Sequence, residues 1–238
     1  MVGALLTPFV FWLVVGAGFG RSFQAPGIDA SYGYLEYFFP GSLVMILLFT
    51  AIFSTISIIE DRREGFLQSV LVAPVSRASI VLGKILGATL LALFQGMLFL
   101  VVAPLAGLPI GVGTFLLLIG VMIYLAFGLT SLGFLIAWRM NSIQGFHAIM
   151  NLFLLPMWLL SGAVFPSSGA PVWIRWVMDV NPLTYGVALV RHTMYLSRSA
   201  NGMDLPSVQN SLLFLAFTNI VLFVLAIRAV SRSSSKAV

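Results

Sequence analysis

An all-helical membrane protein with six transmembrane helices is the fold class that this sequence predicts, and three observations predict it. Of the 238 residues, 60% are hydrophobic and 8% are charged, whereas soluble domains are about 45–50% apolar. The mean hydropathy of +1.08 reflects more apolar surface than a soluble core of this length can bury. The apolar residues also gather in runs close to the roughly 20 residues that a helix needs to cross a bilayer. These runs are residues 3–19, 38–59, 80–103, 114–138, 146–164 and 212–230.

The first run, residues 3–19, is short and contains Pro8, and no Lys or Arg precedes it. Because it lacks the basic start and the small-residue cleavage site of a signal peptide, we expect it to be a first span. Its abrupt beginning is consistent with an assigned start that has lost an upstream cytoplasmic segment. The fifth run contains Pro156, which removes one backbone hydrogen bond and therefore predicts a kink.

The side of the membrane that carries more Lys and Arg is expected to face the cytoplasm. Six spans place residues 20–37, 104–113 and 165–211 on one side and the other segments on the opposite side. The first side carries Arg21, Arg175, Arg191 and Arg198, and the second carries Arg62, Arg63, Arg77, Lys84, Arg139, Arg228, Arg232 and Lys236. The second side is therefore predicted to be cytoplasmic, with both termini inside. The net charge of +5 follows this topology, so no nucleic-acid partner is expected.

Residues 165–198, on the predicted outer side, are too apolar for a solvated loop, yet prolines interrupt them. Trp173 and Trp176 suit a helix at the level of the lipid headgroups. Asn181 followed by Pro182 predicts a helix start, with Asn as the N-cap and Pro at the first helical position. We expect two short re-entrant or interfacial helices here, in preference to a seventh span.

A charged segment separates the second and third spans. The chain has 12 Lys and Arg and 7 Asp and Glu, and six of these lie within residues 60–77. Within residues 64–73, apolar side chains at 66, 67, 70 and 71 form one stripe of a short helix that Pro74 ends. The pattern predicts a helix lying at the cytoplasmic surface. An ordinary interfacial loop, whose charges only mark the membrane boundary, is the alternative from the residues alone.

Two motifs in this order resemble those of ABC-2 type transporter permeases, of the daunorubicin-resistance and nodulation-export kind, and the resemblance covers nearly the whole chain. The first lies in the charged segment and the second between the fifth and sixth spans. Matching residues of the first are Glu60, Arg62 or Arg63, Gly65, Pro74, Ser76, Arg77, Gly83 and Lys84; those of the second are Leu160, Gly162, Phe165, Pro166, Pro171, Trp173, Asn181, Pro182, Tyr185 and Arg191.

The resemblance implies a single membrane domain, residues 1–238, whose segment 64–73 is a coupling helix that docks into a separate cytoplasmic ATPase. It also implies export, a bacterial inner membrane, and ATP and magnesium on the partner with no cofactor in this chain. In the family an amphipathic cytoplasmic helix normally precedes the first span; this sequence departs from that pattern, which suggests a mis-assigned start or a divergent member. The implied coupling residues are Glu60, Arg62, Arg63, Glu64, Gly65, Phe66, Leu67, Val70, Leu71, Pro74 and Arg77. The implied outer-gate residues are Phe165, Pro166, Pro171, Trp173, Asn181, Pro182, Tyr185 and Arg191.

Several classes of chemistry find little support in the sequence. The P-loop pattern is absent, so an ATP-driven transporter would need its ATPase on another polypeptide. The expected spans contain no carboxylate for a coupling ion, which disfavours a proton or sodium carrier. The two His residues and the absence of Cys leave no metal site or intramembrane hydrolase constellation. His147 and Asn151, on one helix face, and Gln95 are more typical of helix–helix hydrogen bonding.

The sequence is therefore interpreted as the permease subunit of an ATP-driven exporter that works as a dimer, expected to be a homodimer, in contact with membrane lipids. We expect the substrate route between the two copies, near the first, second and fifth spans. The scarcity of charge within the membrane favours an amphiphilic cargo of lipid, drug or saccharide type. An ion-coupled secondary transporter, or another self-contained membrane protein, is the alternative.

Overall fold

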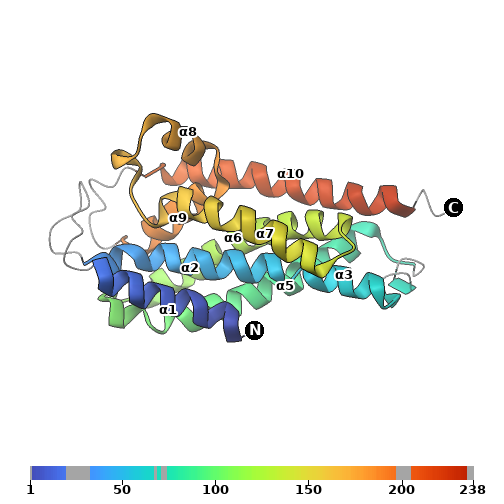
Figure 1. Ribbon diagram of the computed structural model, residues 1–238, viewed down its shortest axis with the longest axis horizontal. Coiled ribbons are helices and arrows are strands. Elements are labelled where there is room, and N and C mark those ends of the chain that lie inside the picture. The colour runs from blue at the N-terminus through green and yellow to red at the C-terminus, as the bar shows by residue number, and fades with distance from the viewer. Residues whose placement is uncertain (1, 20–32, 67–68, 71–73, 197–204, 235–238) are drawn as a thin grey trace.

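The computed structural model describes residues 2–19, 33–66, 69–70, 74–196 and 205–234, and all regular elements within these ranges are helical. The long helices run side by side along the long axis of the molecule (Figure 1). The α-helices are α1 (Val2–Phe19), α2 (Tyr34–Phe53), α3 (Ile56–Arg63), α5 (Arg77–Leu100), α6 (Val112–Arg139), α7 (Ile143–Trp158), α8 (Val172–Val180), α9 (Pro182–Met194) and α10 (Val208–Ser234). Short 3-10 turns cover Ala103–Ala106 and Ser167–Gly169, and a π turn covers Leu159–Ala163.

Five helical stretches among the described residues are long and apolar enough to cross a membrane. They confirm a multi-pass membrane protein. The first of the six expected spans, residues 3–19, is not among them and stays a prediction. Its residues form α1, an 18-residue helix that lies along the first part of α2. A 3.0 Å hydrogen bond from Trp12 Nε1 to the Leu35 carbonyl joins the two helices. The five stretches are Tyr34–Arg63, Arg77–Leu100, Val112–Arg139, Ile143–Ala163 and Val208–Arg232.

Helix α2 is the centre of the bundle. Its residues 36–48 are buried without a break, as expected of a helix that is apolar all round. Helices α1, α5, α6 and α9 pack against it. By contrast, α7 buries a single stripe, Phe146, Met150, Leu154 and Trp158, in which each side chain lies four residues from the next and so on one face. Helix α2 is therefore the element on which the position of α1, α5, α6 and α9 depends.

The second span extends further than the sequence predicted. A turn at Ser54 and Thr55 separates α2 from α3, and both hydroxyls donate 2.6 Å hydrogen bonds to backbone carbonyls of the preceding turn. The chain nevertheless continues as helix to Arg63. Residues 60–63 were expected in a surface segment beyond the span, but they form the last turn of α3 and so belong to the helical stretch Tyr34–Arg63.

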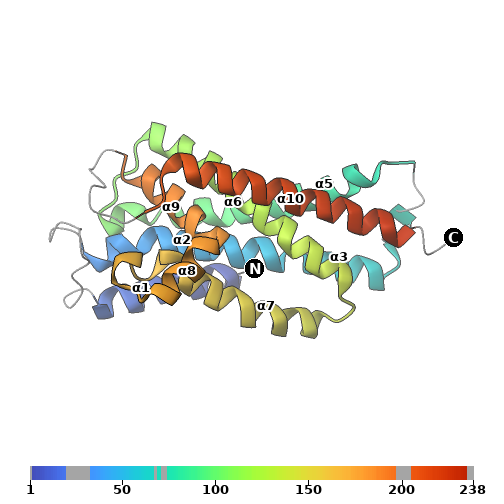
Figure 2. The same cartoon turned by 90° about the horizontal axis from the view of Figure 1, so that it is seen from above.

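The two ends of the bundle differ in composition. Helix α3, the start of α5 and the end of α10 lie at one end, and α8 and α9 lie at the other (Figures 1 and 2). The described basic residues divide in the same way. Toward the first end lie Arg62, Arg63, Arg77, Lys84, Arg139, Arg228 and Arg232, and toward the second lie Arg175 and Arg191. This is the grouping that the sequence predicted. The second end, which the sequence predicts to be extracytoplasmic, is called the outer end below. Arg21, Arg198 and Lys236 lie outside the described residues.

Candidate functional site

Helix α7 is broken at its outer end. Its regular part contains Pro156 and stops at Trp158, and the π turn that follows has non-helical backbone at Leu160 and Gly162. The φ angle of Gly162 is +78°, in the left-handed region that glycine occupies without steric cost. The predicted kink therefore lies just beyond the proline. A break of this kind frees backbone carbonyl groups, which need other partners where water is scarce.

Asn181 supplies two of these partners. Its amide Nδ2 donates hydrogen bonds of 2.6 Å to the Met157 carbonyl and 3.0 Å to the Leu160 carbonyl. Its Oδ1 accepts a 3.0 Å bond from the backbone N–H of Leu183, which confirms the predicted N-cap before Pro182. One buried side chain thus fixes the start of α9 and the broken end of α7 together.

Helix α2 contacts the same broken end from the other side. Tyr34 donates a 3.2 Å hydrogen bond to the Val164 carbonyl, and Tyr37 donates a 3.4 Å bond to that of Gly162. Trp158 Nε1 donates a 2.8 Å bond in return to the Gly41 carbonyl. The backbones approach so closely that a Cβ atom at Gly41 would lie 2.7 Å from the carbonyl oxygen of Ala163. The outer ends of α2, α7 and α9 therefore form one hydrogen-bonded unit.

Arg191, in α9, is a charged side chain within this unit. It is 2% exposed, and guanidinium groups keep their charge even when buried. Its Nη2 atom donates bonds of 3.4 Å to the Tyr37 carbonyl and 3.3 Å to the Ala163 carbonyl. The guanidinium carbon lies 4.1 Å from the centre of the Tyr37 ring, a cation–π distance. Its Nε atom has no hydrogen-bond partner among the described residues.

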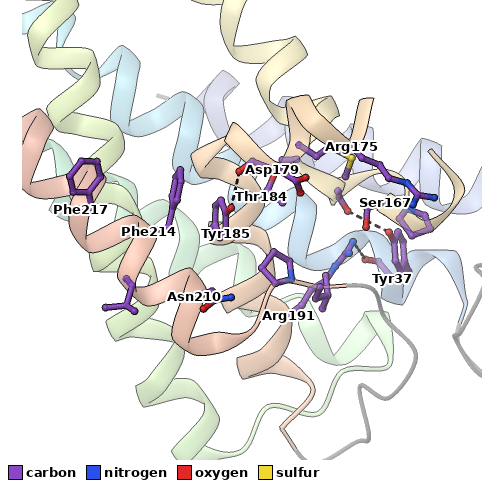
Figure 3. A pocket seen from close by; sticks show the side chains of 17 residues that line it. Tyr37, Ser167, Arg175, Asp179, Thr184, Tyr185, Arg191, Asn210, Phe214 and Phe217 are labelled. Atoms are coloured by element: carbon purple, nitrogen blue, oxygen red, sulfur yellow. Dashed lines mark hydrogen bonds between the residues drawn. The ribbon is translucent and has the colours of Figure 1, made fainter. Parts of the chain in front are cut away.

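A cavity of about 770 Å³ opens beside Arg191 and lies between the end of α7, α8, α9 and the start of α10 (Figure 3). Tyr185 lies on one wall, where its ring stacks on Phe214 with a centroid distance of 4.1 Å. Its hydroxyl donates a 2.8 Å bond to the Asp179 carbonyl. Burial, and secondarily the carboxylate of Asp179, raise the pKa of Tyr185, so the phenol is neutral at physiological pH. The wall also includes Arg175, Thr184, Asn210, Leu213 and Phe217.

The structure brings together only part of the predicted outer gate. Pro166, Tyr185 and Arg191 line the cavity, and Asn181 caps the start of α9, which forms one of its walls. Phe165 and Pro182 are half-buried, whereas Pro171 and Trp173 are exposed and are not among the residues that line the cavity. Sequence reasoning missed Thr184, Asn210, Phe214 and Phe217. No signal in the sequence marks these residues, because their contribution depends on how α9 and α10 pack.

At the opposite end, Arg62 and Arg63 hold the connection between α6 and α7. Arg62 donates hydrogen bonds to the carbonyl groups of Trp138 and Met140 and to Asn141 Oδ1. Its guanidinium carbon also lies 5.1 Å from the centre of the Trp138 ring. Arg63 donates two bonds, of 2.8 and 3.2 Å, to the Asn141 carbonyl. This Arg62–Arg63 clasp ties the end of the second span to the connection between the fourth and fifth.

The rest of the predicted coupling segment is described in part. Gly65, with φ of +78°, follows α3, and residues 66, 69 and 70 are helical, whereas Leu67 and Leu71 lie outside the described residues. Phe66 is 56% exposed. Arg77 begins α5 behind the N-cap Ser76, and an ion pair between Lys84 and Asp61 joins α5 to α3. Glu60, Glu64 and Pro74 are exposed.

A second hollow, of about 660 Å³, lies between α2, α3, α5 and α7, nearer the clasp. Here Thr50 donates a 2.6 Å hydrogen bond to Gln95 Oε1, so the predicted role of Gln95 in joining two helices is confirmed. The ring of His147 lies 4.8 Å from that of Phe53. No group of three potential metal ligands occurs in the part of the chain that the structure describes.

Comparisons with known proteins point to one family. Residues 1–195 match the family described as ABC-2 type transporter. The chain is 26% identical over 207 residues to "Putative transport permease ycf38" of Cyanophora paradoxa, an alignment that covers 84% of this chain and 71% of that protein. It is 28% identical over 192 residues to "Nodulation protein J" of Sinorhizobium fredii, covering 80% and 72%.

A third relative is considerably longer than the region that matches. The chain is 27% identical over 166 residues to "Probable multidrug ABC transporter permease YbhR" of Escherichia coli. That alignment covers 69% of this chain but 44% of the relative, so the chain spans less than half the length of that permease.

Proposed function

The chain belongs to the ABC-2 type transporter family, and from this premise we propose that it is the membrane subunit of an ATP-driven exporter, powered by a separate cytoplasmic ATPase. The family match and the five apolar helices support a multi-pass transport permease. The proposal includes the partner ATPase with its ATP and magnesium, and transport in the outward direction. It also includes a second copy of this chain and an inner membrane with both termini on the cytoplasmic side.

The exposure of Phe66 is the observation that carries the coupling assignment. This ring is 56% exposed at the end of the bundle where basic residues gather, and charged Glu60, Arg63 and Glu64 precede it. An exposed apolar side chain next to charged residues is a common docking feature, because burial of the ring gives affinity and the charges set the register. We therefore assign residues 64–73 to contact with the ATPase.

The Arg62–Arg63 clasp supports a route for mechanical coupling. Because α2 and α3 are almost continuous, a displacement of residues 64–73 would move the second span. The clasp would carry the same displacement to the start of α7 through the carbonyl groups of residues 138–141. Planar guanidinium groups with several bonds each are suited to this task, since they resist rotation better than a single ammonium contact.

The hollow between α2, α5 and α7 supports the position of the substrate route. It borders the second and fifth spans, two of the three near which the route between the copies is expected, and its polar residues include Thr50, Gln95, His147, Glu60 and Lys84. An amphiphilic cargo suits a lining that combines apolar side chains, such as Phe53 and Leu91, with these polar ones. The name of one relative, a probable multidrug permease, favours a drug-like or lipid-like compound for this chain as well.

Co-purification tests the proposal. The tagged full-length chain would be expressed with a candidate ATPase, beside a variant carrying Glu64→Lys and Phe66→Ala. Both positions are exposed, so the fold should be unaffected and the ATPase should be lost. Phe94→Ala is the matched control, because Phe94 is also 56% exposed but lies within the third span.

Two results would count against the assignment. Retention of the ATPase by the double variant would remove residues 64–66 from the docking surface. Transport by the purified chain without any ATPase would favour a self-contained carrier instead. In that case Glu60 and His147, which line the second hollow, would be the candidates for binding a coupling ion.

A further inference from the structure

We propose that the outer cavity binds the acidic headgroup of a membrane amphiphile, a phosphate or a carboxylate, with Arg191 and Thr184 as its polar contacts. The inference deepens the proposed function, because it names the headgroup class of the cargo. It rests on the proposed function at one point, where the bound amphiphile is taken to be the exported cargo. The binding itself is a property of this chain alone.

The charge of Arg191 is incompletely matched within the protein. No carboxylate forms an ion pair with it among the residues that the structure describes. Its two hydrogen bonds, at 3.3 and 3.4 Å, are long and both use Nη2. The buried Nε therefore still has a donor to offer. A buried cation with an unused donor beside a cavity is the arrangement that an anionic group completes.

Thr184 provides a second unsatisfied group on the same wall. It is 8% exposed, and its buried hydroxyl has no partner among the described residues. Thr184 and Arg191 lie seven residues apart on α9, which places them on one face and about 10 Å apart along the helix axis. A headgroup of that length, with an anionic group at one end and a polar group at the other, would satisfy both.

The other charged groups of the cavity allow this assignment. The guanidinium of Arg175 is held by the carbonyl groups of Ala170 and Ser168, and Asp179 is exposed at the rim. Two arginines against one carboxylate leave the lining positive. Asp179 and Arg175 lie on α8, whereas Arg191 lies deeper, beside Tyr37 (Figure 3).

The wall contributed by α10 is apolar and suits the hydrocarbon part of an amphiphile. Leu213, Phe214 and Phe217 line the cavity, and Leu213 and Phe217 are also 62% and 68% exposed. Because α10 is one of the apolar candidate spans, this wall continues into a surface that suits lipid chains. A small soluble anion would use Arg191 and leave the apolar wall empty, whereas an acidic lipid would use both.

Binding of a fluorescent phosphatidylglycerol, labelled on an acyl chain, to the full-length chain in detergent tests the inference. Unlabelled phosphatidylglycerol, inorganic phosphate and diacylglycerol, which has the same acyl chains but no phosphate, serve as competitors. We expect phosphatidylglycerol to compete about tenfold better than diacylglycerol, the worth of one charge-assisted hydrogen bond. Arg191→Gln should abolish this preference. Arg228→Gln, an exposed arginine at the opposite end of the bundle, should leave it unchanged.

Thr184→Val keeps the test decisive if Arg191→Gln does not fold. The two side chains have nearly the same shape, and the Thr184 hydroxyl has no partner to lose among the residues that the structure describes, so the variant should fold normally. We expect it to bind phosphatidylglycerol about fivefold more weakly, the worth of one neutral hydrogen bond. Unchanged binding in Thr184→Val, or equal competition by diacylglycerol, would overturn the proposal.

The remaining outcomes separate the possible sources of the anion and the two proposals. Full competition by inorganic phosphate at the same concentration as phosphatidylglycerol would overturn the lipid assignment in favour of a soluble anion. The binding assay contains no ATPase, so its failure would leave the co-purification result intact. Loss of the ATPase contact in Glu64→Lys/Phe66→Ala should, in turn, leave phosphatidylglycerol binding unchanged.

Discussion

Asn181, the first residue before α9, donates a 2.6 Å hydrogen bond to the backbone carbonyl of Met157 near the end of α7. The bond joins two segments 24 residues apart at the point where α7 stops being a regular helix. It makes the position of α9, and with it the walls of the outer cavity, depend on the geometry of the fifth span. Any movement of α7 should therefore be felt at Tyr185 and Arg191.

Replacement of Asn181 by Ala should destabilise the outer end. The change removes an N-cap, worth about 1 kcal/mol, and leaves two carbonyl groups without a partner, at about 1–3 kcal/mol each. Thermal unfolding in detergent should show a lower midpoint. Asn151→Ala, an exposed position on α7, is the control and should unfold like the wild type. Equal midpoints for both variants would mean that water replaces the amide.

Gly41→Ala should disrupt the contact between α2 and the π turn. The new Cβ would lie 2.7 Å from the Ala163 carbonyl oxygen and 3.0 Å from the Ala163 Cα atom, so backbone rather than a flexible side chain would have to move. We expect a loss of about 1–3 kcal/mol, typical of overpacking, measured as a lower midpoint or lower yield of folded protein. Gly120→Ala has open space around it and should be neutral or slightly stabilising; a similar loss there would point to a general intolerance of the bundle.

Arg62→Lys should weaken coupling more than it weakens assembly. Lysine keeps the charge but cannot reach Trp138, Met140 and Asn141 at once, since it lacks the planar fork. We expect the ATPase to stay bound while less substrate is exported per ATP hydrolysed, measured in proteoliposomes. Arg228→Lys is the matched control. An unchanged ratio in Arg62→Lys would assign the clasp to stability alone.

Thr50→Val should destabilise the contact between α2 and α5. It removes the 2.6 Å donor to Gln95 Oε1, and Gln95 is buried, so its amide oxygen would be left unpaired at a cost of about 1–3 kcal/mol. Thr218→Val is the control, because the Thr218 hydroxyl bonds to the Phe214 carbonyl of its own helix rather than to a neighbouring helix. A lower unfolding midpoint in Thr50→Val alone is the expected result, and a gain in stability would show that the pair costs more than it contributes.

The sequence predicted the parts of this site that depend on local chemistry. Asn181 and Pro182 predicted the start of α9, because an N-cap and a first-turn proline act within a few residues. The grouping of basic residues at the two ends also followed from the lengths of the apolar runs. The direction of the Asn181 amide toward Met157 and Leu160 did not, since it requires the π turn and the packing of α9 against α7.

Arginine positions show the same division. Arg62 and Arg63 were expected to face a partner protein, and the structure has them bonded to carbonyl groups of residues 138–141. A charge on an exposed turn and a charge that caps a distant connection look alike in sequence. Arg191 was placed at the outer gate only through family resemblance. Its burial against Tyr37 arises from contacts 154 positions apart, which no local pattern records.

The broken end of α7 also has a consequence for the order in which the protein matures during synthesis. The tyrosines that bond to it from α2 leave the ribosome long before it, but Asn181 and Arg191 emerge after it. Until α9 has been made and inserted, the carbonyl groups of Met157, Leu160 and Ala163 lack these partners inside a lipid environment. A chain at this stage therefore has unpaired backbone carbonyl groups at the end of α7. Membrane proteases should degrade truncations that end before Asn181 far faster than the finished protein.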